Sequence, residues 1–321
     1  MRFFAAPLRF FAALLALCSL SYATPAQAPP DGAPVEQKLY DFPSYERAVE
    51  STDVERYASK EAYERAVSDR RFAFRKLKYL SDGLRVTAYL YGPAQAGGAK
   101  LPAIVFNRGS TVRGDIAPEL IAFFHRLASE GFVVLAPLYR QSDGGEGRDE
   151  VGGADLNDLL NVVPLARALG FVDADNLFLY GESRGGMMTY QALAHGFPAN
   201  AAAVFGALTD IEALVRDHPE VYTPALLKQF WPDFEARRAE IFRSRSALRW
   251  AESLNAPLLI MHGGADRAVS PAQSLALAQR LQQLGKTYGL VIYPGDGHTL
   301  ARNQEDRDRR ALLWFKAHLK K

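Results

Sequence analysis

Short apolar runs alternate with amphipathic stretches from residue 101 to the C-terminus. Six runs have the continuous apolar character of buried parallel strands, at 101–107, 132–139, 176–181, 201–208, 256–263 and 288–294. Five stretches have helical spacing, at 117–131, 154–170, 184–196, 271–285 and 305–321, and Pro164 predicts a kink in the second. Strand and helix alternating at these lengths predict a doubly wound, mostly parallel α/β sheet.

The pattern differs on the N-terminal side and in one insertion. Residues 29–35 predict a flexible leader, and residues 43–72 predict polar, solvated helix. Two alternating runs within 72–93 flank Asp82-Gly83 and predict a β-hairpin. Residues 210–250 hold aromatic and basic side chains without a strand pattern. They predict a small helical insertion, which is either a flap over the carboxyl edge of the sheet or a surface helix pair.

The first 28 residues have the pattern of a cleavable signal peptide. Arg2 and Arg9 accompany the apolar stretch "FFAALLALCSL", and small residues follow up to Ala28. The apolar run is shorter than the roughly 18 residues that a membrane anchor needs, so we expect cleavage and a secreted or periplasmic protein. We therefore divide the chain into a signal peptide (1–28), an N-terminal segment (29–84) and an α/β domain (85–321).

Cleavage would change the charge and the chemistry of the chain. It would leave 36 basic and 36 acidic residues, so no basic excess points to nucleic acid or to an anionic membrane. The single cysteine, Cys18, would be removed with the signal, which excludes a disulfide and a cysteine metal site. No spacing elsewhere indicates zinc or calcium, and we expect no metal.

A serine stands where one strand pattern passes directly into a helix pattern, in "LFLYGESRGGMM" (177–188). Gly181 and Gly185 leave room for a strained turn, and Gly186 lets the following helix pack closely. A serine on such a turn exposes its hydroxyl at the edge of the sheet. The context therefore predicts Ser183 as a nucleophile.

Serine needs a base and an acid to act as a nucleophile. In α/β sheets that carry a serine on such a turn, these partners follow along the chain in the order serine, acid, histidine. His298 is the predicted base, because it lies in a glycine-rich loop after the last strand. The other histidines after Ser183 lie on the elbow helix, in the insertion, at a strand end and on the last helix. Asp266, directly after a strand, is the predicted acid, and Asp210 is its rival at the end of an earlier strand.

An oxyanion needs hydrogen-bond donors beside the nucleophile. One is the backbone N–H of Arg184, the residue after Ser183. The second is expected from the loop after the first buried strand. It is the backbone N–H of Arg108 or Gly109, or the side-chain amide of Asn107, unless Asn107 only shapes the local turn.

A further glycine-rich segment covers residues 140–155. It lacks the dinucleotide-binding spacing and the loop lysine of a phosphate site, and its carboxylates would repel phosphate. It predicts a mobile active-site loop, and we expect no cofactor.

From about residue 85 onward the chain resembles the catalytic domain of the prolyl oligopeptidase family of serine peptidases. The resemblance rests on "YGESRGGMMTYQAL", "HGGADRAVSPAQS", "YPGDGHTL" and the loop "LYRQSDGGEGRDEVGGAD". It implies an α/β-hydrolase fold with Ser183, Asp266 and His298 as the catalytic triad. Two features depart from the family. A β-propeller would need roughly 160 residues, and only 29–84 are available, while Asn107 stands where relatives have tyrosine or histidine.

The expected function is that of an exported serine hydrolase that cleaves a small peptide or ester through an acyl-enzyme on Ser183. A carboxylesterase is the first alternative, since the same triad cleaves both bonds. A binding protein that kept the scaffold is the second alternative. The expected partner is a small peptide or ester substrate, with no nucleic acid and no membrane after signal cleavage, and the sequence leaves the oligomeric state open.

Overall fold

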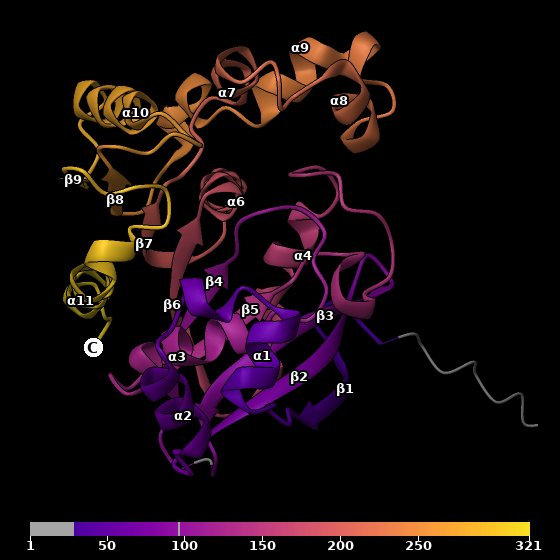
Figure 1. Cartoon of the computed structure of the whole chain (residues 1–321), viewed down its shortest axis with the longest axis vertical. Coiled ribbons are helices and arrows are strands. Elements are labelled where there is room, and N and C mark those ends of the chain that lie inside the picture. The colour runs from indigo at the N-terminus through magenta and orange to yellow at the C-terminus, as the bar shows by residue number, and fades with distance from the viewer. Residues whose placement is uncertain (1–28, 96) are drawn as a thin grey trace, which may run out of the picture.

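The alternating apolar runs form one nine-stranded sheet in the computed structural model, which describes residues 29–95 and 97–321. The strand order is β1-β2-β3-β5-β4-β6-β7-β8-β9 (Figure 1). The strands are β1 (Pro34–Leu39), β2 (Phe72–Ser81), β3 (Leu84–Pro93), β4 (Leu101–Asn107), β5 (Val133–Pro137), β6 (Val172–Glu182), β7 (Ala199–Phe205), β8 (Leu258–Gly263) and β9 (Tyr288–Tyr293). Pairs from β5 to β9 are parallel, and β1, β2 and β3 are antiparallel to their neighbours. The sheet is therefore mostly parallel, as the pattern predicts.

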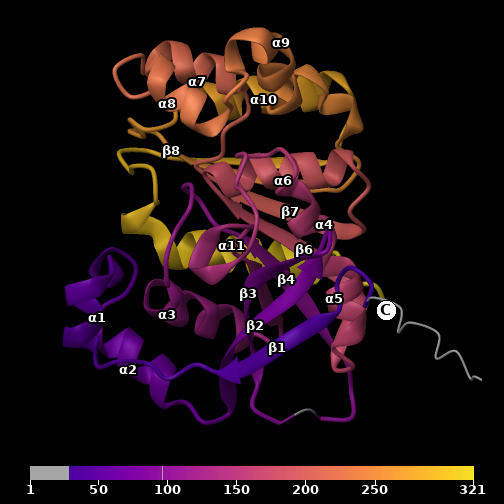
Figure 2. The ribbon, with the colours of Figure 1, turned by 90° about the vertical axis from the view of Figure 1, so that its right-hand side faces the viewer.

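Helices cover both faces of the sheet (Figure 2). They are α1 (Tyr45–Ser51), α2 (Lys60–Ser68), α3 (Ala117–Ala128), α4 (Leu156–Leu160), α5 (Val162–Ala168), α6 (Arg184–Ala194), α7 (Ile211–Asp217), α8 (Pro224–Phe230), α9 (Phe234–Ser244), α10 (Pro271–Gln283) and α11 (Gln304–Ala317). On one face, α5, α6 and α10 bury Leu165, Met187 and Leu277. On the other, α3 and α11 bury Phe124 and Phe315 in a separate cluster. Two apolar faces explain why the central strands are continuously apolar.

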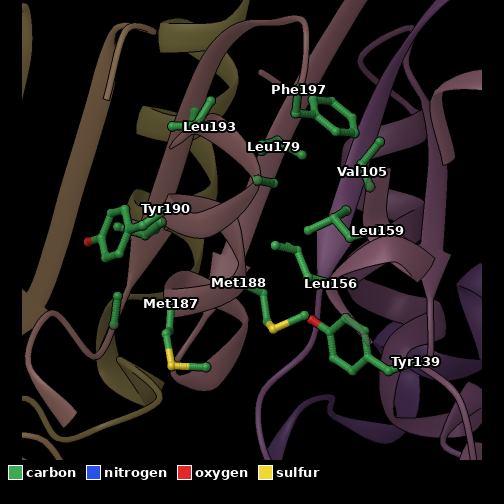
Figure 3. Close-up of a cluster of buried hydrophobic side chains, with 14 of the residues drawn as sticks. Val105, Tyr139, Leu156, Leu159, Leu179, Met187, Met188, Tyr190, Leu193 and Phe197 are labelled. Atoms are coloured by element: carbon green, nitrogen blue, oxygen red, sulfur yellow. The ribbon is translucent and has the colours of Figure 1, made fainter. Parts of the chain in front are cut away.

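The core around α6 holds the helix firmly beside the sheet. Figure 3 shows Met187 and Met188 of α6 with Leu156 of α4 and with Val105 and Leu179 of the sheet. All five side chains are nearly or fully buried. The start of α6, which carries the predicted nucleophile, is thus fixed by packing on several elements.

The N-terminal segment departs from one prediction. Residues 29–35 were expected to be a flexible leader, but Pro34 begins β1, which pairs with β2. The backbone N–H of Gly32 also donates to the carbonyl of Leu80 at 2.7 Å. Leader and strand were indistinguishable because an exposed edge strand has no buried face to impose an apolar alternation. The hairpin itself is confirmed, with Asp82 and Gly83 at φ 52° and 74°.

Two further local details differ. The helix expected over 154–170 is divided at Asn161 into α4 and α5, three positions before the proline that was expected to kink it. The insertion, 210–250, forms the three helices α7, α8 and α9 in place of a pair. The predicted signal peptide, 1–28, lies outside the described residues. No helix among the described residues is long and apolar enough to span a membrane.

Candidate active site

Ser183 occupies a strained turn between β6 and α6. Its backbone has φ 53° and ψ −119°, which is unfavourable for a residue with a side chain. Its N–H donates to the carbonyl of Phe205 at the end of β7, at 3.0 Å. A Cβ at Gly185 would lie 2.7 Å from the carbonyl oxygen of Arg108 and closer still to that of Asn107. The turn therefore needs glycine because the backbone at the end of β4 presses against it.

Loops after two other strands bring the predicted base and acid to Ser183. His298 Nε2 lies 2.9 Å from Ser183 Oγ, and His298 Nδ1 lies 2.7 Å from Asp266 Oδ2. Gly206 allows this approach, since a Cβ there would lie 2.8 Å from the carbonyl oxygen of His298. The predicted serine, histidine and aspartate thus form one hydrogen-bonded chain.

A second histidine holds Asp266 in place. His262 Nε2 lies 3.0 Å from Asp266 Oδ2, and its Nδ1 lies 2.6 Å from the hydroxyl of Ser274. The backbone N–H of Val269 donates to the other carboxylate oxygen at 3.0 Å. Burial by itself raises the pKa of Asp266, but hydrogen bonds from His262 and His298 leave the pKa well below its usual range. Asp266 is therefore held as a carboxylate.

The electrostatics of His298 follow from this carboxylate. Burial disfavours the imidazolium, yet the hydrogen bond and the charge of Asp266 outweigh it and raise the pKa of His298 above its ordinary value. The rival acid, Asp210, lies elsewhere and caps α7, where its carboxylate accepts from the N–H groups of Glu212 and Ala213. The structure thus places Asp266, and not Asp210, against the histidine.

Three of the predicted oxyanion donors are backbone N–H groups near Ser183, those of Arg184, Gly109 and Arg108. Arg184 is the first residue of α6, so its backbone N–H has no acceptor within the helix. Gly109 lies directly against the nucleophile, because a Cβ there would be 3.2 Å from Ser183 Cβ. The Arg108 guanidinium turns inward and donates to the Thr111 and Leu138 carbonyls, both at 2.6 Å, which leaves its backbone as the candidate.

The Asn107 side chain does not reach the nucleophile, contrary to one of the predicted possibilities. Asn107 is fully buried at the end of β4, and its Nδ2 donates to Thr189 Oγ1 of α6 at 2.8 Å. The turn that was the other interpretation is absent as well, since Asn107 is a strand residue. Its amide instead ties β4 to α6 behind the nucleophile.

The glycine-rich loop 140–155 acts from behind the site and does not line it. Asp149 and Asp155 form ion pairs with the buried Arg184 guanidinium, at 2.7 and 2.8 Å. The same guanidinium lies 4.6 Å from the centre of the Tyr139 ring. The prediction of a mobile active-site loop is therefore corrected: two buried carboxylates attach the loop to the residue after Ser183.

A cavity of about 270 Å³ opens beside Ser183 and His298. Its walls include Arg56 and Tyr57, which belong to the N-terminal segment, and also Arg113 and Glu119. No residue of 210–250 lines it, so the insertion is not a lid on this cavity. Neither Arg56 nor Tyr57 could be predicted as a cavity residue, because a polar helical stretch has the same pattern whether it faces solvent or a cavity.

Glu182 is a further functional candidate that the motif did not reveal. It precedes Ser183, lines the same cavity, and has a pKa raised by burial.

Among the described residues no group of three or more His, Cys, Asp or Glu side chains is arranged to hold a metal ion. Ser183, His298, Asp266 and the backbone N–H groups beside them have the arrangement that acyl transfer requires.

Comparison with known proteins supports a hydrolase fold for this chain. An uncharacterized peptidase of Bacillus subtilis, YtmA, is 30% identical over 241 residues, which cover 74% of this chain and 91% of that relative. The solved Pyrococcus horikoshii acylaminoacyl peptidase has a TM-score of 0.63 and 24% identity, covering 78% of this chain and 42% of that chain. An acetyl xylan esterase from Paenibacillus sp. R4 has a TM-score of 0.61 and 17% identity, and the match covers 78% of this chain and 86% of the esterase chain. These two likenesses concern the fold, which is that of an α/β-hydrolase.

The family follows from the sequence match. The model of the prolyl oligopeptidase family matches residues 121–321, which is more than half of the chain. The chain spans less than half of the acylaminoacyl peptidase that it resembles in structure. The family model and the Bacillus relative both describe peptidases. This chain belongs to the prolyl oligopeptidase family, and it is a serine hydrolase.

Proposed function

We propose that this chain is an exported serine hydrolase that cleaves small peptides or esters through an acyl-enzyme on Ser183. The observation that carries the proposal is the chain of hydrogen bonds from Ser183 Oγ to His298 to Asp266, at 2.9 and 2.7 Å. The strained backbone at Ser183 adds support, because strain of this kind persists where the surrounding structure holds a reactive group in position.

In the first half of the reaction, His298 Nε2 takes the proton of Ser183 Oγ while Oγ bonds to the substrate carbonyl carbon. Asp266 accepts from His298 Nδ1–H and stabilises the imidazolium. The negative oxygen of the tetrahedral intermediate accepts from the Arg184 N–H and from the N–H of Gly109 or Arg108. The imidazolium then gives its proton to the leaving amine or alcohol as the bond from that group to carbon breaks.

In the second half, His298 removes a proton from water, which attacks the acyl carbon of the acyl-enzyme. The second tetrahedral intermediate uses the same N–H donors. Its collapse returns the proton from His298 to Ser183 Oγ and releases the carboxylic acid product. Both halves need a neutral imidazole at the start.

Labelling with a fluorophosphonate probe tests the nucleophile. The native chain should be labelled at Ser183, and the variant Ser183→Ala should not. Ser110→Ala is a matched control, since Ser110 also lines the cavity and has no role in the proposed chemistry. Equal labelling of native chain and Ser183→Ala would defeat the proposal, and absence of label on the folded native chain would favour the binding-protein alternative.

A carboxylesterase is the second candidate function, and the size of the cavity favours it. At about 270 Å³ the cavity is close to the lower end of the usual range of about 300–1,000 Å³ for ligand pockets, which suits a small substrate. Steady-state rates on paired anilide and ester substrates with one acyl group separate the two functions. Comparable turnover of both supports the peptidase, and negligible anilide turnover leaves the esterase.

Export is tested by expressing the whole chain in a bacterium and recovering it from the periplasm or the medium. We expect a mature N-terminus at Pro29, after Ala28. A recovered protein that still begins at Met1 would contradict the proposed cleavage.

A further inference from the structure

Glu182 lies against the same loop as the nucleophile. A Cβ at Gly109 would be 3.2 Å from Ser183 Cβ and 3.6 Å from Glu182 Cγ, so both side chains pass this glycine. Glu182 also lines the cavity beside Ser183 and His298. In the proposed reaction the substrate carbonyl carbon bonds to Ser183 Oγ, and the α-nitrogen of an acyl residue is two bonds from that carbon. An acyl residue therefore brings its α-nitrogen into the cavity that Glu182 lines.

The carboxylate of Glu182 has unused hydrogen-bonding capacity. Neither oxygen accepts a hydrogen bond from the described residues, and no basic side-chain nitrogen among them lies within 4.0 Å. The side chain is half-buried, and its oxygens keep accessible surface, unlike the sealed Oδ1 of Asn107. A ligand in the cavity can therefore reach both oxygens.

Burial raises the pKa of Glu182, although cationic side chains around it favour the charged form. In order of effect these side chains are Arg307, His298, Arg113 and Arg56. His298 is neutral at the start of the proposed reaction. Each of the three arginines has a carboxylate closer to it than that of Glu182.

Arg307 directs its N–H groups to other acceptors. Its Nε donates to Asp308 Oδ1 at 2.8 Å, and its Nη1 donates to the carbonyl of Thr299 at 2.9 Å. Arg126 donates to the other oxygen of Asp308 at 2.7 Å. Two arginines share one aspartate, so their excess positive charge favours a charged Glu182 from a distance. They supply no hydrogen bond to it.

Arg113 and Arg56 have partners as well. Arg113 Nη2 donates to Glu119 Oε1 at 2.6 Å, which neutralises the other carboxylate in the cavity wall. Arg56 Nη1 lies 4.0 Å from Asp53 Oδ2, and the Arg56 side chain is 65% exposed. In the part of the wall that the structure describes, Glu182 is thus the carboxylate left for a substrate.

Tyr57 adds a second acceptor beside Glu182. Its hydroxyl forms no hydrogen bond with the described residues, and like the oxygens of Glu182 it keeps accessible surface. Burial and the charges of Glu182 and Glu119 raise the pKa of Tyr57 to about 12, so the hydroxyl stays neutral.

A smaller cavity of about 20 Å³ adjoins the one at Ser183 and shares Tyr57, Glu182 and Thr299 with it. A water molecule needs about 10–15 Å³ on this measure, so the space admits one group of that size. An ammonium group fits there, and the side chain of lysine does not. The rings in its wall belong to Phe106, Phe123 and Phe205.

Solvent satisfies an accessible carboxylate while the cavity is open, but a bound acyl group displaces that solvent. An acyl group without a donor then leaves a charge unpaired, which is costly. An α-ammonium group supplies up to three N–H donors and the opposite charge, which together form the stronger type of hydrogen bond.

We propose that Glu182, together with the Tyr57 hydroxyl, binds the α-ammonium group of the acyl residue. The substrate is then an amino-terminal residue with a free amine, joined to its leaving group by a peptide or an ester bond. The inference rests on the proposed acyl transfer at Ser183 and adds to it the class of the acyl group.

Two phenyl esters of equal shape test the ammonium site. Phenyl glycinate carries –NH₃⁺ where phenyl propanoate carries –CH₃, and at pH 7 its amine is mostly protonated, since an α-amine has a pKa of about 7.7 or higher. Release of phenol gives kcat/KM for each ester, with Ser183→Ala as the blank for spontaneous hydrolysis. The ammonium also makes its ester intrinsically more reactive. The glycinate-to-propanoate ratio is therefore compared between chains, because this effect then cancels.

In Glu182→Gln the ratio should fall about 30-fold, because the amide keeps the shape of the side chain and loses its charge. Tyr57→Phe should lower the ratio about fivefold, since it removes one neutral acceptor. Asp53→Asn is the matched control: it removes a carboxylate that does not line the cavity at Ser183, and the ratio should stay within about twofold. Fluorophosphonate labelling shows that the nucleophile is assembled in each variant.

A second pair of esters identifies the source of the cation. Phenyl 6-aminohexanoate and phenyl heptanoate differ in the same way at the end of a long chain, as a lysine side chain would. We expect their ratio to be equal in the native chain and in Glu182→Gln. A ratio that depends on Glu182 for this pair, and not for the glycinate pair, would overturn the assignment to the α-ammonium group.

An unchanged glycinate-to-propanoate ratio in labelled Glu182→Gln would also overturn the proposal. If that variant does not fold, an unchanged ratio in Tyr57→Phe would do so. Failure of the proposed function gives a different result, since the native chain would then hydrolyse neither ester and take no fluorophosphonate label.

Discussion

Adding one methyl group at Gly185 should disable the nucleophile turn. In Gly185→Ala, the new Cβ would lie 2.7 Å from the carbonyl oxygen of Arg108 and closer still to that of Asn107. An ordinary carbon–oxygen contact is about 3.3 Å or longer. Because both obstacles are backbone atoms at the end of β4, neither can rotate away, and the turn itself must move.

The loss of stability in Gly185→Ala can be estimated from two opposing effects, overpacking and helix propensity. Overpacking costs about 3 kcal/mol at the upper end of its usual range, and alanine in place of glycine in a helix returns about 1 kcal/mol. We expect a net loss of about 2 kcal/mol in the free energy of unfolding. A displacement of about 1 Å between Ser183 and His298 should lower kcat/KM about 100-fold, since the 2.9 Å contact between them would be lost.

The assay compares ester hydrolysis and urea unfolding in Gly185→Ala and in a matched control. Gly297→Ala adds the same methyl group next to His298, where a Cβ would have no heavy atom within 4 Å. The control should keep native activity and stability within about twofold and 0.5 kcal/mol. If Gly185→Ala behaves like the control, the turn is not pressed against β4, and our account of the glycine requirement is wrong.

Three further predictions concern the charged groups. Asp266→Asn should lower kcat by about 10⁴, since the amide would favour the wrong tautomer of His298. Asp210→Asn should leave activity nearly unchanged and cost little stability, because asparagine caps a helix about as well as aspartate; the reverse order of activities would identify Asp210 as the acid. The pH profile of kcat/KM should fall on the acid side with an apparent pKa above about 6.5, because Asp266 raises the pKa of His298 and only its neutral form accepts a proton; a midpoint below that value would contradict the assigned pair. Asp155→Asn should lower the free energy of unfolding by about 3 kcal/mol in urea, since it removes a buried partner of Arg184; an unchanged midpoint would show that the ion pair has no net stabilising effect.

The sequence was informative wherever function depends on local pattern. The nucleophile turn, the order of the chemical groups and the mostly parallel sheet could be predicted because strand and helix periods are properties of neighbouring residues. Ser183, His298 and Asp266 were predictable for a related reason: each follows a strand, and the carboxyl ends of parallel strands meet at one edge.

Predictions failed where a residue's role depends on the direction of its side chain. The Asn107 amide was one candidate for the second oxyanion donor, yet Asn107 ends β4 and its side chain turns into the core, toward Thr189. The 140–155 loop was placed near the site by its glycines, but its attachment to Arg184 depends on two carboxylates whose burial the sequence does not display. In each case the outcome was set by which partner lay within reach.

The sequence by itself therefore determined the architecture and the identity of the chemical groups. Only the tertiary structure decided what surrounds them: that Arg56 and Tyr57 wall the cavity at Ser183, and that Glu182 lines it without a hydrogen-bond partner among the described residues. The physical reason is that periodicity records which face of an element is buried, while a cavity depends on contacts between elements far apart in the chain. Those contacts follow from packing and from the desolvation of polar groups, which no local pattern contains.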